Sequence, residues 1–204
     1  MFSYDSLKKI LFKFEPETAH NIAEYGLRVL GKCRIAKAYM EKKNYISNPK
    51  LTQEIFGVRF ENPVGLAAGF DKNATMIKSM KSLGFGFTEI GTMTPKPQDG
   101  NPKPRMFRYP ELKSVQNAMG FNNKGAHEVL KNLKKVYPFS IPVGANIGKN
   151  KFTPEEFALS DYKSLIKKFE ANSDYLVINI SSPNTPNLRA LQNEKFITEL
   201  FTMA

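Results

Sequence analysis

Polar side chains that could do chemistry gather directly after four apolar segments of the chain. The four clusters lie at residues 69–73, 91–92, 146–150 and 179–185. One such cluster could be ordinary turn chemistry, because Gly, Asn, Ser and Pro are the commonest turn residues. Four in succession, each where an apolar segment ends, favour a ligand site, since ligands of parallel α/β folds bind at the carboxyl ends of the strands.

The residue types in these clusters suit the recognition of a flat polar ring. Lys72 supplies a fixed positive charge for an anion, and the amides of several asparagines offer paired donors and acceptors to a heterocycle such as a flavin or a pyrimidine. Hydrolysis fits badly, because no Ser-His-Asp arrangement is apparent. The chain also lacks a GxxxxGK[ST] phosphate loop, and its GFGFTEIGT segment does not satisfy G-x-G-x-x-G.

The sequence predicts no metal site. Cys33 is the only cysteine, and the two histidines, His20 and His127, fall on separate predicted helices. We therefore expect both histidines to be surface or packing residues. Cys33 cannot form a disulfide within the chain.

The elements that must position these clusters alternate in type from residue 51 onward. Apolar runs predict strands at 64–68, 87–92, 141–147 and 175–180, and helical patterns follow at 74–83, 126–137, 164–170 and 189–201. Continuously apolar strands that alternate with helices are typical of a parallel sheet covered by helices. A complete (β/α)₈ barrel needs about 250 residues. The pattern alone is therefore compatible with two architectures, an open α/β sheet and the first half of a barrel.

Residues 1–50 follow a different pattern. Two short amphipathic helices are predicted, with Gly31 as a stop for the second and a polar linker at 42–50. Their apolar stripes are Leu7, Ile10, Leu11 and Phe14, and then Ile22, Tyr25, Val29 and Leu30. Such a pair could lie in a membrane interface or could pack on the following domain, and the pattern alone does not separate the two.

Composition excludes several classes of protein. The 204 residues are 41% hydrophobic, enough for a sizeable core, and no apolar run is long enough to span a bilayer. The net charge of +11 is concentrated in residues 1–50 and 101–150, which suggests an acidic partner. Nucleic acid is the weakest candidate, because the basic residues are not interleaved with aromatics and no recognition motif appears.

Five segments carry a resemblance to a known family. They are NPVGLAAGFDKNA (62–74), EIGTMTPKPQDGNPKPRMFR (89–108), QNAMGFNNKG (116–125), VGANIGKNK (143–151) and NISSPNTPNLRALQ (179–192). In this order they resemble the motifs of dihydroorotate dehydrogenase, and the N-terminal helical pair resembles the extension of its quinone-dependent class 2 branch.

The resemblance implies an α/β fold: a (β/α)₈ TIM barrel of which this chain carries about the first four βα units. A small helical domain at 1–45 would precede the barrel portion at 46–204. We expect Val64, Ile90, Val143 and Ile178 to face the barrel interior. The apolar helical pattern also continues to residue 204, so we expect a longer natural chain.

The resemblance also assigns roles by position. The residues implied to bind FMN are Ala68, Gly69, Phe70, Asp71, Lys72, Thr92, Asn146 and Asn179. Those implied to bind the substrate are Lys72, Asn117, Ala118, Met119, Gly120, Phe121, Asn179 and Asn184. Ser182 matches the class 2 catalytic base, where class 1 has cysteine, and Thr185 and Phe121 would assist it. Asn187 stands where the family commonly has glycine, so we expect a left-handed backbone there.

The implied activity is the oxidation of dihydroorotate to orotate in pyrimidine biosynthesis. FMN would accept the hydride and a quinone would be the final electron acceptor. The implied location is the cytoplasmic side of the inner membrane, where the protein would bind peripherally to the anionic surface without contacting nucleic acid. One alternative stays open, a non-catalytic truncated barrel that binds a membrane or a partner through residues 1–50.

Overall fold

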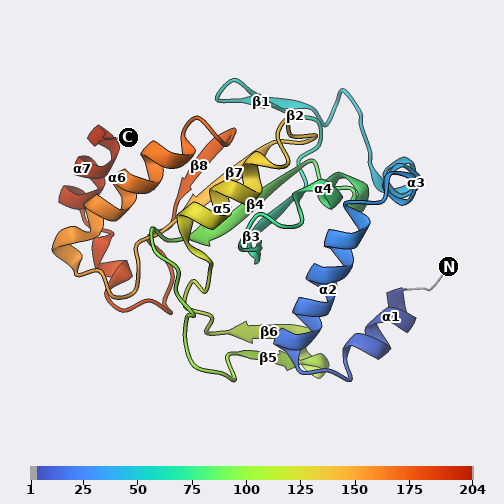
Figure 1. Cartoon of the computed structure of the whole chain (residues 1–204), viewed down its shortest axis with the longest axis horizontal. Coiled ribbons are helices and arrows are strands. Elements are labelled where there is room, and N and C mark those ends of the chain that lie inside the picture. The colour runs from blue at the N-terminus through green and yellow to red at the C-terminus, as the bar shows by residue number, and fades with distance from the viewer. Residues whose placement is uncertain (1–3, 204) are drawn as a thin grey trace.

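A four-stranded parallel sheet forms the centre of the computed structural model, which describes residues 4–203. Its strands are β3 (Gly65–Asp71), β4 (Phe87–Met93), β7 (Val143–Ile147) and β8 (Tyr175–Ile178), hydrogen-bonded in that order. Each predicted strand is present, and the prediction of a helix-covered parallel sheet is confirmed (Figure 1). All four carboxyl ends therefore meet at one edge, which places the polar clusters together.

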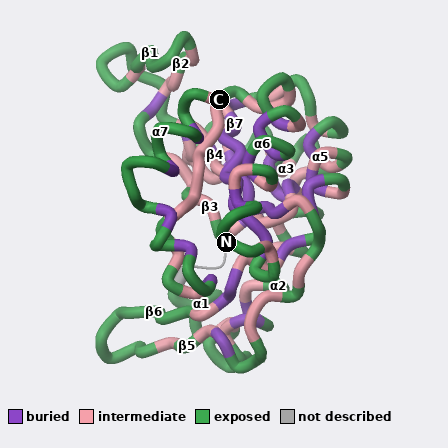
Figure 2. The backbone as a smooth tube through the Cα atoms, turned by 90° about the vertical axis from the view of Figure 1, so that its left-hand side faces the viewer, coloured by how far each residue is buried: buried purple, intermediate pink, exposed green. Residues whose placement is uncertain are grey.

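Helices cover one face of this sheet and enclose the main core. They are α4 (Ile77–Met80), α5 (Gly125–Lys134), α6 (Ala158–Phe169) and α7 (Glu194–Met203). Four short 3₁₀ turns lie at Lys81–Leu83, Pro110–Leu112, Glu155–Phe157 and Leu188–Leu191. The apolar stripe of α6, including Tyr162 and Phe169, is fully buried against the sheet. Buried residues follow this sheet–helix interface through the molecule (Figure 2).

The expected inward orientation is wrong for Ile90, Val143 and Ile178. Ile90 and Val143 are fully buried in the cluster that the helices form, and Ile178 packs against the same cluster. Val64 lies before β3 and is 60% exposed. A strand that is apolar throughout has no alternation, so its sequence does not indicate which side chains face the helices.

The opposite, inner face combines glycines with aromatic rings. A Cβ on Gly65 would overlap the ring of Phe87, and a Cβ on Gly144 would overlap the ring of Tyr175. The two glycines therefore make room for these rings on the inner face. Phe60 closes the group, with its ring centroid 5.3 Å from that of Phe87 and 6.0 Å from that of Tyr175.

In the described residues, three helices precede the sheet: α1 (Tyr4–Leu11), α2 (Pro16–Leu30) and α3 (Arg34–Asn44). The side chain of Glu15 caps α2 by accepting from the amide of Thr18 at 2.9 Å, and the helix ends before Gly31, as predicted. Helix α3 was not predicted, and it includes the start of the expected linker at 42–50. Among the described residues, no helix combines the length and apolarity needed to cross a membrane.

Two antiparallel hairpins were also not predicted from the sequence. The strands β1 (Gln53–Ile55) and β2 (Val58–Phe60) form one, and β5 (Met106–Tyr109) and β6 (Ser114–Asn117) form the other. Their strands are only three or four residues long and mostly exposed, so they carry little hydrophobic pattern.

Two predicted helix starts were wrong, one because of a left-handed residue and the other because of a side-chain cap. Helix α4 begins at Ile77 instead of Ala74, since Ala74 is left-handed with φ 58°. The helix expected at 189–201 is interrupted after Leu191. It restarts as α7 at Glu194, where the Asn193 carboxamide accepts from the amide of Phe196 at 2.9 Å.

Candidate active site

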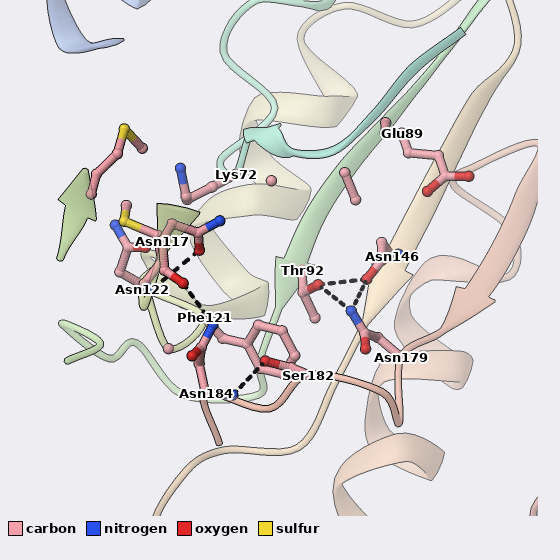
Figure 3. A pocket seen from close by; sticks show the side chains of 16 residues that line it. Lys72, Glu89, Thr92, Asn117, Phe121, Asn122, Asn146, Asn179, Ser182 and Asn184 are labelled. Atoms are coloured by element: carbon pink, nitrogen blue, oxygen red, sulfur yellow. Dashed lines mark hydrogen bonds between the residues drawn. The ribbon is translucent and has the colours of Figure 1, made fainter. Parts of the chain in front are cut away.

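A cavity of about 500 Å³ opens at the carboxyl ends of the four strands (Figure 3). Twelve of the residues assigned from the sequence line it. They are Ala68, Gly69, Lys72, Thr92, Asn117, Met119, Gly120, Phe121, Asn146, Asn179, Ser182 and Asn184. The fold therefore brings together side chains from five separate segments.

Three assigned residues do not line this cavity: Phe70, Asp71 and Ala118. The Asp71 carboxylate is fully buried and accepts the amides of Thr75 and Met76, each at 2.8 Å, so it caps the start of α4. Phe70 stands edge-on to His20 at a centroid distance of 4.9 Å, which confirms His20 as a packing residue. The pKa of Asp71 is raised by burial, in opposition to these amide donors.

Three side chains form a polar cluster across the sheet. The Thr92 hydroxyl donates to Oδ1 of Asn146 at 2.6 Å and accepts from Nδ2 of Asn179 at 3.0 Å. Gly91, opposite Asn146 in the register, makes this possible: a Cβ there would overlap the Asn146 carbonyl oxygen. The cluster orients both amides, and all three residues line the cavity (Figure 3).

Lys72 brings the positive charge to the cavity. It follows the last residue of β3 directly, and its side chain stands over the cavity beside Asn117 (Figure 3). Its ammonium group has no hydrogen bond or ion pair with any residue in the described part of the chain. Burial lowers the pKa of Lys72, an effect that the nearby carboxylates of Glu24 and Glu17 oppose.

The loop at 117–122 forms the wall facing the sheet. Gly120 and Phe121 both have left-handed backbones, with φ 71° and φ 54°. The side chain of Gln98 donates to the carbonyl oxygens of Gly120 at 3.0 Å and Phe121 at 3.2 Å, which holds this turn. The ring of Phe121 lies against Gly148, where a Cβ would come within 3.1 Å of it.

The loop after β8 presents Ser182. The amide of Asn184 donates to Oγ of Ser182 at 3.2 Å, and the Thr185 hydroxyl is buried without a hydrogen-bond partner in the described structure. Asn187 has φ 56°, which confirms the left-handed backbone expected there. The adjacent Ser181 instead contacts Asn179, whose Oδ1 accepts the Ser181 amide at 3.1 Å.

Four cavity residues were missed by the sequence reasoning: Ala67, Glu89, Met106 and Asn122. Glu89 is the only carboxylate among the lining residues, and its charge, after burial, is a cause of the raised pKa of Tyr175. Glu89 sits in the middle of β4, whereas the prediction drew on polar residues that follow strands. Glu89 is the only charged residue in β4, and a charge inside a predicted strand was the signal that could have found it.

This arrangement can hold a planar polar group and an anion. Small residues at 67–69 form one wall, amides and hydroxyls supply donors and acceptors, and Lys72 supplies charge. Across the described residues, no group of three or more His, Cys, Asp or Glu side chains could hold a metal ion.

Comparisons with known proteins agree with this chemistry. A family model described as dihydroorotate dehydrogenase matches residues 50–204. The chain is 60% identical over 203 residues to a dihydroorotate dehydrogenase (quinone) of a Sulfurovum species, covering 100% of this chain and 57% of the relative. The same named protein of a Nitratiruptor species is 59% identical over 201 residues, 98% of this chain and 57% of the relative.

The fold has solved counterparts. A DHODH from Eimeria tenella, crystallised in complex with ferulenol, matches with a TM-score of 0.78 and 41% identity. That match covers 92% of this chain and 50% of the solved chain. The present chain thus spans a little over half the length of these curated relatives and about half of the solved chain.

Proposed function

Because the chain belongs to the dihydroorotate dehydrogenase family, we propose that the protein oxidises (S)-dihydroorotate to orotate in de novo pyrimidine biosynthesis. FMN is the proposed hydride acceptor, and a quinone is the final electron acceptor. The observation that carries this proposal is the convergence of Ser182, Lys72 and the asparagine amides on one cavity.

The cavity fits FMN in its chemistry. The small residues at 67–69 leave room for a planar ring, and the fixed amides of Asn146 and Asn179, with the Thr92 hydroxyl, suit its polar edge. When bound, FMN supplies an acceptor for the hydride that leaves C6 of dihydroorotate. Backbone groups of Ala68 and Gly69 complete the proposed contact, while the Asp71 carboxylate accepts the amides of Thr75 and Met76 before α4.

We assign substrate binding to the part of the cavity that the proposed FMN contacts at 67–69 leave open. Lys72 has no anionic partner among the described residues, so its ammonium is available to the substrate carboxylate and to the charge that develops on the ring. Asn117 and Asn184 project amides into the same space, and the carboxamide of Asn184 donates to the Asn117 carbonyl at 3.4 Å. That contact joins the two substrate loops.

Ser182 is the proposed base that takes the proton from C5. An ordinary serine is a weak base and needs activation. The amide of Asn184, which donates to Oγ, favours negative charge on that oxygen. The Thr185 hydroxyl, which is buried without a hydrogen-bond partner in the described structure, can relay a proton, and Phe121 lines the same cavity as Ser182.

The domain organisation and the location are also proposed. Residues 1–45 form the helical domain, and 46–204 carry about the first four βα units of a (β/α)₈ barrel that the remaining length of the relatives completes. In α1, Leu7 and Ile10 are 50% and 51% exposed beside lysines, which supports a role in binding an anionic membrane. That membrane is the proposed inner membrane, on its cytoplasmic side, where the quinone is dissolved.

Purification of the full-length protein tests the proposal directly. We expect bound FMN, bleaching of its absorbance when dihydroorotate is added without oxygen, and formation of orotate. A short-chain quinone should then restore the absorbance. A protein that binds no FMN, or holds FMN that dihydroorotate does not reduce, would contradict the proposal and favour the non-catalytic alternative.

A further inference from the structure

A segment outside the cavity connects the loops that form it. Residues 98–105 run behind the 117–122 loop, and none of them lines the cavity. Gln98 donates through Nε2 to the carbonyls of Gly120 and Phe121, while its Oε1 accepts from Asn150 at 2.9 Å. This side chain therefore joins the loop after β6 to the loop after β7.

Asn101, in the same segment, joins two further loops. Its Nδ2 donates to the Ala118 carbonyl at 3.0 Å and to the Asn184 carbonyl at 3.3 Å, and its Oδ1 accepts from Nζ of Lys151 at 2.9 Å. Gly120 packs directly on it, since a Cβ there would lie 2.9 Å from Cγ of Asn101. The position of Asn101 thus affects both the 117–122 loop and the loop that carries Ser182.

Arg105, the last residue of the 98–105 segment, fixes the backbone of that segment. Its Nη1 group donates to the carbonyl oxygens of Asp99 and Asn101, the latter at 2.9 Å. A Cβ on Gly100 would come within 2.9 Å of the same nitrogen. The guanidinium therefore fixes the backbone that carries the Asn101 side chain.

The charge of Arg105 is matched by a residue of the N-terminal helices. Glu17, in the first turn of α2, accepts from Nη2 of Arg105 at 2.7 Å and from Nε at 3.1 Å. Both side chains are less than one-tenth exposed, and only Lys103, at 3.5 Å from Glu17, adds a second cation among the described residues. A buried two-point contact of this kind fixes geometry more strictly than a surface ion pair does.

We propose that Glu17 and Arg105 are positioning residues through which α2 sets the substrate-binding loops, with Asn101 as the contact that transmits their position. The inference rests on the proposed function for its substrate. It predicts that the N-terminal helices affect dihydroorotate binding, in addition to any role at the membrane.

The test compares Glu17→Gln, Asn101→Ala and their double variant in the full-length, FMN-loaded enzyme. Orotate affinity is measured from the change in flavin absorbance, and flavin reduction by dihydroorotate is followed in stopped flow without quinone. Glu61→Gln is the matched control, because Glu61 also pairs with an arginine, Arg59, at 2.8 Å, but on the exposed surface.

We expect Glu17→Gln and Asn101→Ala each to weaken orotate binding by about tenfold. The substrate concentration for half-maximal reduction should rise by a similar factor, while the limiting rate falls less than about threefold, because neither residue touches the reacting atoms. The loss of orotate affinity in the double variant should be smaller than the product of the two single losses, and Glu61→Gln should bind orotate as the wild type does.

Three results would overturn the inference. The first is an unchanged orotate affinity in Glu17→Gln. The second is a loss of orotate affinity in the double variant equal to the product of the two single losses, and the third is a loss of orotate affinity in Glu61→Gln as large as that in Glu17→Gln. Should Glu17→Gln fail to fold, Asn101→Ala with wild-type orotate affinity would overturn the inference on its own. A wild-type enzyme that dihydroorotate does not reduce would instead refute the proposed function, so the two failures are distinguishable.

Discussion

At the scale of single residues, the electrostatics of Lys72 give the clearest consequence for binding. Its ammonium lies in a partly desolvated cavity with no anionic partner among the described residues, and burial lowers its pKa. The lysine therefore loses its proton at a lower pH than an exposed lysine does. A negatively charged ligand depends on that proton.

We predict that orotate affinity falls as the pH rises through this lowered pKa, before the pH of about 10.4 at which an ordinary lysine titrates. Orotate titrations of the full-length enzyme from neutral pH up to that value measure the effect. Lys72→Met is the reference, with weak binding that lacks this pH dependence. A wild-type curve parallel to that of Lys72→Met would show that Lys72 does not hold the anion.

The motifs identified most of the cavity, because twelve of the fifteen residues assigned from the sequence line it. Two of the three exceptions, Phe70 and Asp71, share a cause. A motif gives the order of residues along the chain, but Phe70 and Asp71 point away from the cavity that their neighbours Gly69 and Lys72 line. Glu89 was missed for the opposite reason, since it reaches the cavity from the middle of a strand.

At the scale of elements, strand positions could be predicted and strand faces could not. The apolar runs were long enough to locate β3, β4, β7 and β8. However, Ile90 and its neighbour Gly91 are both compatible with a core, so only packing decides that Ile90 faces the helices. The hairpins were missed because their short strands are held by backbone pairing and by contacts distant in sequence, such as Phe60 on Phe87.

The cap of α4 gives a stability prediction. Asp71→Ala removes the buried acceptor of the Thr75 and Met76 amides, which should destabilise the full-length enzyme by about 1–3 kcal/mol. The melting temperature should therefore fall by several degrees, with FMN still bound at low temperature. Glu54→Ala, which removes an exposed carboxylate from β1, should leave the melting temperature unchanged. Loss of FMN from Asp71→Ala at unchanged melting temperature would instead identify Asp71 as a cofactor ligand.

Helix α1 gives a prediction about membrane binding. Leu7→Ser combined with Ile10→Ser removes the two half-exposed apolar side chains, so we expect the full-length protein to stop floating with anionic liposomes. Reduction of FMN by dihydroorotate should persist. Ile35→Ser, which removes an even more exposed apolar side chain from α3, is the control and should float normally. Flotation of the double variant would rule out α1 as the membrane contact.

At the scale of the whole molecule, the sheet has two free edges in the described part of this chain. Strands β3 and β8 each pair with only one neighbour in the four-stranded sheet. Unpaired edge strands promote association between chains. The inner face with Phe87 and Tyr175 would also be covered by further strands in a closed barrel.

We therefore predict that the 204-residue chain, expressed as printed, aggregates or dimerises and lacks stoichiometric FMN. Size-exclusion chromatography with detection at a flavin wavelength checks both properties, with the full-length protein as the reference. A monodisperse yellow monomer that reduces quinone with dihydroorotate would contradict the prediction, because it would show that these four strands suffice for a folded, FMN-binding, active protein.

The central claim is that this cavity oxidises dihydroorotate with Ser182 as the base. Stopped-flow reduction of the FMN-loaded, full-length enzyme by dihydroorotate tests it most directly, with Ser181→Ala as the matched control. We predict that Ser182→Ala keeps its FMN but is reduced about 10²–10⁴ times more slowly, whereas Ser181→Ala changes the rate less than about threefold. Reduction of Ser182→Ala at the wild-type rate would contradict the claim.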